Sequence, residues 1–220
     1  MNLSLQTTLR ASLLLAAAAL ANPAKADIIY QSATAGSSPN GGFVVQGDGT
    51  TDGSNIIGGV FTVSQTSQVK DIGGNFITSA PGSSSGPIFG EIVAVPNGAT
   101  APAQSIENLV ALARVVFTPT GDGDFKAALS VLLGPGTYAV LFGGNLTDAS
   151  GFATLSDGNT PVGPSSLFED NFGGADPSPW DNFAPADIRI FVDGTIPEPA
   201  SLTLFAAGLG MLGFARRRKA

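Results

Sequence analysis

The chain has 220 residues, enough for one domain or at most two. It contains neither cysteine nor histidine, which excludes disulfide bonds, Ser-His-Asp and Cys-His nucleophilic systems, and zinc or iron sites built from those ligands. The net charge is −7, and the chemistry left open is paired-carboxylate hydrolysis, Ser-Lys chemistry or none.

The N-terminus has the pattern of a secretory signal peptide. Arg10 precedes an apolar run from Ala11 to Ala21, and Asn22-Pro23 then leads into Ala24-Lys25-Ala26. The run is too short to span a bilayer, and Ala-x-Ala suits signal peptidase, which prefers small residues at the cleavage site. We therefore predict that signal peptidase removes residues 1–26 and that the mature chain begins at Asp27.

Residues 27–195 have the texture of an all-β domain. Short apolar stretches alternate with Gly, Ser, Thr, Asn and Asp, and no amphipathic helix of several turns is evident. The expected strands lie at 42–46, 55–65, 69–78, 87–95, 125–133, 137–142 and 187–192, and 105–117 is expected to start as a short helix or irregular segment before becoming a strand. Regular short strands with Gly-rich connections predict an exported β-sandwich or jelly roll.

Two glycine-containing motifs predict local features of the backbone in this domain. Gly73-Gly74 interrupts the strand at 69–78 and predicts a bulge or a turn there. Gly134-Pro135-Gly136 separates the strands at 125–133 and 137–142, which predicts an antiparallel hairpin.

Two acidic, glycine-rich segments offer oxygen ligands for a metal ion. Asp48 and Asp52 lie in a Gly-rich loop that is a weak candidate for Ca²⁺, because the spacing is not that of an EF-hand and no distal Glu closes the loop. Gly121-Asp122-Gly123-Asp124 is weaker still, since a β-turn explains it. Calcium is thus the one cofactor that the sequence suggests.

An aromatic and amide-rich segment at 169–183 is the best candidate for a ligand surface. Asp-Asn-Phe occurs twice, at 170–172 and 181–183, around the only tryptophan. Aromatic faces stack on sugar rings and Asn side chains hydrogen-bond hydroxyl groups, which predicts a carbohydrate-binding surface formed by Asn171, Phe172, Trp180, Asn182 and Phe183. The alternative is that Phe172, Trp180 and Phe183 fold back to cap one end of the sandwich.

Paired carboxylates are the remaining route to catalysis. Glu91, Glu107, Glu169 and Asp170 are the candidates for a glycosidase pair, which needs a separation of roughly 5–10 Å. Nothing in the sequence pairs them, and none lies in a recognisable catalytic motif. We therefore expect no catalytic residues and no enzymatic activity, with a carboxylate-based glycoside hydrolase as the less favoured alternative.

The C-terminus, 196–220, is the most distinctive segment. Pro197, Glu198 and Pro199 form an extended linker, Ala200 to Ala215 is uncharged and apolar, and a basic cluster follows at Arg216, Arg217, Arg218 and Lys219. Sixteen helical residues would extend about 24 Å, a little less than a hydrocarbon core of about 30 Å. The segment is expected to cross the inner membrane with its basic end in the cytoplasm.

These three ordered parts resemble the PEP-CTERM sorting domain of Gram-negative bacteria. The resemblance implies recognition of Pro197, Glu198 and Pro199 by exosortase, a membrane-embedded cysteine peptidase or transpeptidase, and an association with extracellular polysaccharide. An ordinary tail anchor that is never cut is the alternative.

The exported domain also resembles the β-rich choice-of-anchor domains. The resemblance lies at 72–76, Ile-Gly-Gly-Asn-Phe, at 90–93, Gly-Glu-Ile-Val, and at 136–143, Gly-Thr-Tyr-Ala-Val-Leu-Phe-Gly. It implies a β-sandwich and says little about activity.

Removing both ends makes the remaining chain much more acidic. Residues 27–199 keep four basic residues, Lys70, Arg114, Lys126 and Arg189, against seventeen acids, a net charge of −13. Such a charge repels nucleic acids and anionic lipids. We therefore predict a structural, non-enzymatic protein of the cell surface or extracellular matrix, with a carbohydrate-binding module as the alternative. The resemblance to the sorting family implies that its surroundings are biofilm exopolysaccharide.

Overall fold

Antiparallel β-strands account for nearly all of the structure. The computed structural model describes residues 27–36, 42–46, 55–79, 84–104, 106–144, 148–163, 166–170, 180–183 and 187–196, and at 46, 55, 107, 166–170 and 181–183 the description is limited to the backbone. This part of the chain contains one 3-10 turn, η1 (Ile106–Asn108), and no α-helix. The predicted all-β class is confirmed.

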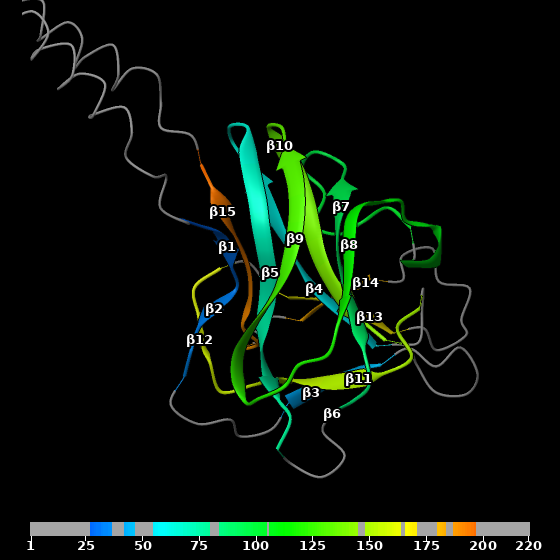
Figure 1. Cartoon of the computed structure of the whole chain (residues 1–220). Coiled ribbons are helices and arrows are strands. Elements are labelled where there is room, and N and C mark those ends of the chain that lie inside the picture. Colours follow the sequence, from blue (N-terminus) through cyan, green and yellow to red (C-terminus); the bar gives the residue numbers. More distant parts are fainter. Residues whose placement is uncertain are drawn as a thin grey trace, which may run out of the picture. The chain divides into compact units, whose positions relative to one another are not determined.

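The main sheet curls so that two halves face each other, as in a β-sandwich (Figure 1). One half has the order β1 (Asp27–Gln31), β15 (Ile190–Thr195), β5 (Ser67–Ile77) and β9 (Gly123–Leu133). The other has the order β14 (Trp180–Phe183), β13 (Ser166–Asp170), β4 (Asn55–Val63), β10 (Gly136–Gly143), β7 (Ile88–Val95) and β8 (Ala111–Phe117).

Short strands join the two halves at one end. They are β3 (Gly42–Gln46), β11 (Phe152–Ser156) and β6 (Ser84–Ser85), and β11 pairs with both β3 and β5. A separate two-stranded ribbon consists of β2 (Ala33–Thr34) and β12 (Thr160–Pro161). The sheet can therefore be followed without a break from β1 to β8.

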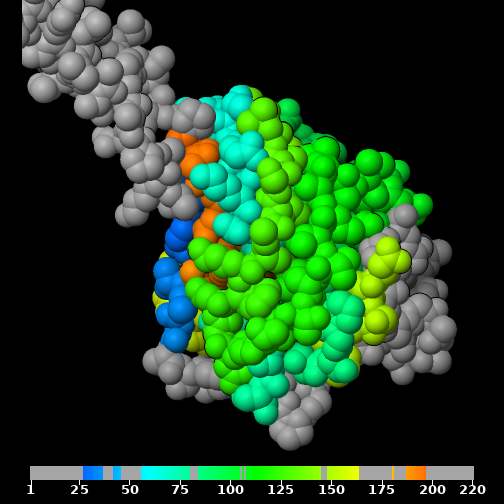
Figure 2. Space-filling model, in the orientation of Figure 1, coloured from blue at the N-terminus to red at the C-terminus, as the bar shows by residue number. Residues whose placement is uncertain are grey.

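The main core fills the space between the halves. Ile72, Phe76 and Val192 come from one half, and Ile92 and Phe142 from the other, and all five are fully buried. Alternate residues of each strand point to this core, as the two-residue period of a strand requires. The outer face of the half formed by β15, β5 and β9 is a continuous surface in Figure 2.

A second core covers the other half on its outer face. Phe89, Val93 and Leu141 pack there with Ile106 of η1 and with Trp180. Strands β7 and β10 are thus buried on both faces, in keeping with their nearly continuous apolar sequences. The predicted irregular start of 105–117, followed by a strand, is confirmed by η1 and β8.

The hairpin predicted around residues 134–136 is wrong. Strand β9 pairs with β5 and β10 pairs with β4 and β7, so the turn carries the chain from one half of the sandwich to the other. A Gly-Pro-Gly turn reverses the chain but does not choose the partner of each strand. Here the buried faces of β9 and β10 pack against opposite sides of the main core.

The bulge predicted at Gly73-Gly74 is also wrong. The pairing of β5 with β9 and β15 is regular through both glycines, and the register with β9 shifts instead between Val69 and Asp71. Glycine is required at both positions because neighbouring atoms leave no room for a side chain. A Cβ atom on Gly73 would clash with the carbonyl oxygen of Phe125 and lie 2.5 Å from Cζ of Phe191.

Replacing Gly73 by alanine is expected to lower the free energy of unfolding by about 1–3 kcal/mol, because the backbone of β9 cannot move away cheaply. Gly121 is the matched control, since no atom lies within 4 Å of the position of its Cβ, and Gly121→Ala should change stability by less than about 0.5 kcal/mol. Urea unfolding of the two variants checks this. Equal stability of the two variants would contradict the steric explanation.

Candidate functional site

Strand β15 carries the chain directly into the predicted sorting signal. It is an inner strand, paired with β1 on one side and with β5 on the other. The last strand residue is Thr195 and the last described residue is Ile196. The predicted recognition residues Pro197, Glu198 and Pro199 lie outside the described residues, as do the signal peptide at 1–26 and the basic cluster at 216–219.

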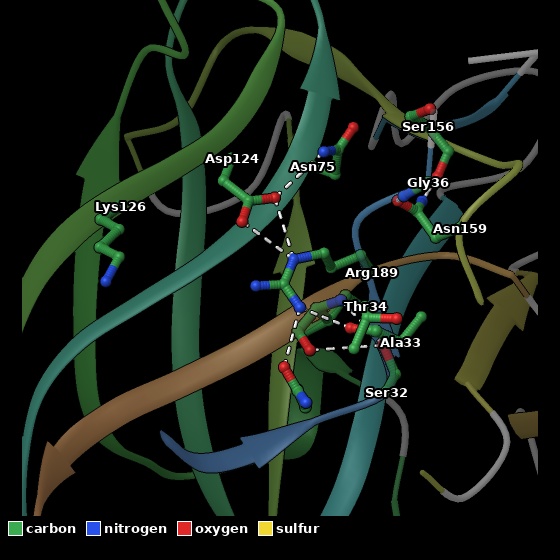
Figure 3. Close-up of polar contacts among 12 residues, drawn as sticks. Ser32, Ala33, Thr34, Gly36, Asn75, Asp124, Lys126, Ser156, Asn159 and Arg189 are labelled. Atoms are coloured by element: carbon green, nitrogen blue, oxygen red, sulfur yellow. Dashed lines mark hydrogen bonds and ion pairs between the residues drawn. The ribbon is translucent and has the colours of Figure 1, made fainter. Parts of the chain in front are cut away.

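Arg189 holds the beginning of β15 in a polar cluster (Figure 3). Its Nε donates to both carboxylate oxygens of Asp124, at 3.0 and 2.9 Å. Its Nη1 donates to Oε1 of Gln31 at 2.9 Å and to the carbonyl oxygen of Ala33 at 2.5 Å. Asn75 completes the cluster by donating to Asp124 at 3.0 Å. One guanidinium group thus connects β9 with the segment that joins β1 and β2.

The hydroxyl group of Ser32 also joins the segment between β1 and β2 to the start of β15, and we call this contact region the junction. Ser32 Oγ donates to the carbonyl oxygen of Ile188 at 2.6 Å and accepts a hydrogen bond from the N–H of Ile190 at 2.8 Å. The backbone N–H of Ser32 donates to the carbonyl oxygen of Ile190 at 2.9 Å. These bonds satisfy buried backbone groups where strand pairing begins.

Phe191 lies on the outer face of β15 and is covered by cations. The guanidinium carbon of Arg189 is 4.9 Å from the centre of the ring, and the ammonium nitrogen of Lys126 is 5.5 Å from it. Lys126 also forms an ion pair with Asp193. Cation–π contacts of this kind contribute about 0.5–1 kcal/mol at exposed sites and more when desolvated. The cations therefore help to shield an apolar ring outside the main core.

A buried ion pair crosses the outer face of β7 and β8. The Glu91 side chain is fully buried; its Oε2 accepts a hydrogen bond from Nε of Arg114 at 2.6 Å and forms an ion pair with Nη2 of Arg114 at 2.5 Å. Its Oε1 has no hydrogen-bond partner among the described residues. Burial raises the pKa of the Glu91 carboxyl, and the hydrogen bond and charge of Arg114 act in the opposite direction. This carboxylate is committed to Arg114 and closed to solvent.

Asp122 of the weaker acidic segment caps a turn. Its carboxylate accepts hydrogen bonds from the Ser79 hydroxyl and from the backbone N–H groups of Thr78 and Ser79, at 2.5, 2.7 and 2.9 Å. These bonds, with the Ser79 hydroxyl contributing most, lower the pKa of Asp122 to about 2. Together with Asp124, which binds Arg189, this segment is explained by contacts within the chain.

Of the five residues predicted to form the ligand surface, Trp180 is the one whose side chain the structure describes. Trp180 is buried in the second core, and its indole N–H donates to the carbonyl oxygen of Gln104 at 2.8 Å. Asn171 and Phe172 lie outside the described residues, and so do the side chains of Asn182 and Phe183. The burial of Trp180 favours the capping alternative for that residue, and a ligand surface formed by all five residues stays a prediction.

The remaining sequence candidates are placed as follows. Asp48 and Asp52 lie outside the described residues, as do the side chains of Glu107, Glu169 and Asp170. Calcium binding and a carboxylate pair therefore stay predictions. In the ranges that the structure describes, no helix is long and apolar enough to cross a membrane.

Sequence reasoning named Arg189 and Arg114 as remaining basic residues but did not assign them a role. The signal that could have identified them is the small number of basic residues in the exported domain. With four basic residues among seventeen acids between 27 and 199, each cation has many potential partners, and three of the four form ion pairs in the structure. The partners themselves are set by strand register, which the sequence pattern does not contain.

Comparison with known proteins identifies the C-terminal segment. Residues 195–219 match the family model of the PEP-CTERM protein-sorting motif. No curated protein and no solved structure is detectably similar to the chain, and the resemblance to choice-of-anchor domains is not shown. The motif implies that the protein is exported and sorted through exosortase by way of a membrane-anchored intermediate.

Proposed function

We propose that the exported domain is a non-enzymatic structural component of the cell envelope or of the exopolysaccharide matrix. In this proposal signal peptidase frees Asp27, exosortase cuts near Pro197, Glu198 and Pro199, and the acidic sandwich leaves the inner membrane for the cell surface or the medium. Extracellular polysaccharide is its expected surrounding rather than a saturable ligand.

The observation that supports this role is the use of charged side chains within the domain. Arg114, Lys126 and Arg189 are held in ion pairs that join strands or cover an aromatic ring. Acids greatly outnumber the basic residues between 27 and 199, so most of the negative charge of this segment is not balanced by positive charge. A domain of this kind stays hydrated and resists non-specific association in a crowded polyanionic matrix.

The sorting step predicts a defined change in mass. Mass spectrometry of the protein recovered from the envelope and the medium of an exosortase-containing bacterium should show a chain that begins at Asp27 and lacks the segment 205–219. Replacing Pro197, Glu198 and Pro199 together by alanine should leave the tail attached and hold the protein at the inner membrane. A strain without exosortase is the matched control. In that strain the unchanged sequence should also keep its tail and stay at the inner membrane. Tails found on mature extracellular protein would contradict the cleavage.

The structural role is tested on the same purified product. Calorimetry against the producer's own polysaccharide should show no saturable binding, and incubation should release no sugar. A saturable signal that Trp180→Ala abolishes without unfolding the domain would replace this proposal with the carbohydrate-binding alternative. Sugar release that disappears on mutating one carboxylate would indicate a hydrolase.

A further inference from the structure

We infer that the end of the sandwich at which β15 finishes docks on the phospholipid bilayer that anchors the sorting signal. We call this the exit end, and it comprises Asp27, Thr195 and the turns at 64–66 and 134–135. It is uppermost in Figure 1. The inference presupposes the membrane-anchored intermediate that the sorting motif implies.

Strand register places both termini of the exported domain at the exit end. Asp27 at the start of β1 pairs with Gly194 near the end of β15. Thr195 pairs with Gln68 at the start of β5, and Gln68 pairs with Leu132 at the end of β9. In the other half, β10 begins here, because Gly136 pairs with Val63 and Thr137 pairs with Val95.

The chain leaves almost no linker between this end and the membrane. The sorting motif begins at residue 195, which is still hydrogen-bonded within β15. Ala200 begins the apolar run, so four residues lie between it and Thr195, and the five steps along the chain can span at most about 18 Å when fully extended. The headgroup layer on each side of a bilayer occupies roughly 5–8 Å of that distance. The anchored domain is therefore confined close to the lipid surface, with the exit end toward it.

Strand register places three exposed apolar side chains toward the exit end. Leu132 is 64% exposed, Ile28 is 51% exposed, and Val110, next to the start of β8, is 82% exposed. Val110 belongs to this region because Ala111 pairs with Val93, two residues before β7 ends. Large apolar side chains placed at a lipid interface can bury area that water would otherwise surround.

Charge is distributed so that the exit end suits a lipid surface better than the opposite end. Among the described side chains, the acids near the exit end are Asp27, Asp71 and Asp193, and Lys70 accompanies them. Lys126 is in register with Gly73 near the middle of β5 and forms its ion pair with Asp193 from there. At the opposite end, Arg189 accompanies five acids among the described side chains, which are Asp122, Asp124, Asp148, Asp157 and Asp187. Among the side chains that the structure describes, the larger group of acids thus lies away from the exit end, which disfavours the reverse orientation at a lipid surface.

The absence of cysteine makes the test direct. Full chains carrying Thr66→Cys at the exit end or Val162→Cys elsewhere are labelled with a fluorophore and reconstituted into phosphatidylethanolamine–phosphatidylglycerol vesicles that contain a headgroup-nitroxide lipid. Val162 is the matched control, because it is 55% exposed and its N–H donates to Ser32, near the start of β15. Quenching should be several-fold stronger at position 66 than at position 162.

A second variant separates docking from tethering alone. Changing Leu132 and Val110 together to serine should reduce quenching at position 66 toward the level at position 162, whereas Val116→Ser, at a side chain that is also exposed but lies farther along β8, should not. Unfolding transitions of all variants confirm that the fold is intact.

Each other outcome counts against the inference in a distinguishable way. Vesicle-bound chains with equal quenching at both positions would overturn the docking surface and leave sorting untouched. Quenching at position 66 that ignores the serine changes would mean that the tether alone brings the end near the lipid, which also overturns docking. Quenching that appears only after exosortase is added would identify a protein-binding face. Chains that fail to associate with vesicles at all would contradict the anchored intermediate itself.

Discussion

Arg114→Met is expected to lower the free energy of unfolding by about 3 kcal/mol at pH 7, the lower end of the range for breaking a buried ion pair. The reason is that Glu91 keeps a fully buried carboxylate, and Arg114 supplies every hydrogen bond that this carboxylate receives from the described residues. The lower end applies because the Arg114 side chain is itself 30% exposed. Urea unfolding followed by the fluorescence of the buried Trp180 measures the loss.

The loss should depend on pH with a defined sign. Burial already raises the pKa of Glu91 above its ordinary value of 4.5, and removing Arg114 takes away the groups that oppose this rise. The folded state of the variant then binds a proton that the unfolded state has released, so stability falls as pH rises from 4.5 through the folded pKa. The difference between the wild type and Arg114→Met should therefore shrink as pH is lowered from about 7 to about 4.

A double variant provides the internal control. Glu91→Met combined with Arg114→Met should recover most of the lost stability, because Phe89, Val93 and Leu141 surround the position with apolar groups. Lys70→Met, at an exposed lysine, should change stability by less than about 0.5 kcal/mol. A single variant that loses the same free energy at both pH values would contradict the assignment of the effect to a buried charge.

Arg189→Met is expected to cost about 2–3 kcal/mol, because it leaves the carbonyl oxygen of Ala33 and Oε1 of Gln31 without the donor that holds them. It also uncovers the ring of Phe191. Amide hydrogen exchange should accelerate most where β1 meets β2, since this is the segment that the guanidinium group fastens to β15.

The variant Asp124→Asn distinguishes the contribution of the ion pair to stability from that of the contacts between Arg189 and both Gln31 and Ala33. Asp124 is partly exposed, so solvent screens its attraction to Arg189, and its loss should cost less than about 1 kcal/mol. Thermal or urea unfolding of the two variants under one buffer gives the comparison. Equal losses for Arg189→Met and Asp124→Asn would mean that the ion pair, and not the contacts with Gln31 and Ala33, stabilises the junction.

Sequence patterns located most strands but not their partners. The strands expected at 42–46, 87–95, 125–133 and 137–142 correspond to β3, β7, β9 and β10 with small changes at their ends. Apolar alternation and turn residues are local signals, and they suffice for this. Strands β13 and β14, at the two ends of the segment 169–183, were not expected, because its amides and aromatics were interpreted as a ligand surface or a cap, whereas β13 pairs with β4 and β14 pairs with β13.

The two glycine predictions failed for a common reason. Gly73 and the turn at 134–136 were interpreted through backbone conformation, which is a local property. In the structure Gly73 is required by a ring from β15 and a carbonyl from β9, both distant in sequence. The turn at 134–136 connects strands whose partners are set by burial in the main core.

The amino-acid sequence was sufficient for the all-β class, the exclusion of histidine and cysteine chemistry, and the C-terminal sorting motif, because each depends on composition or on contiguous residues. The fold was needed to show that Glu91 is buried against Arg114, that Arg189 fastens the start of β15, and that both termini of the domain meet at one end. Those facts arise from contacts between residues far apart in the chain. Their free energy depends on burial and register, and no local pattern of residues encodes either.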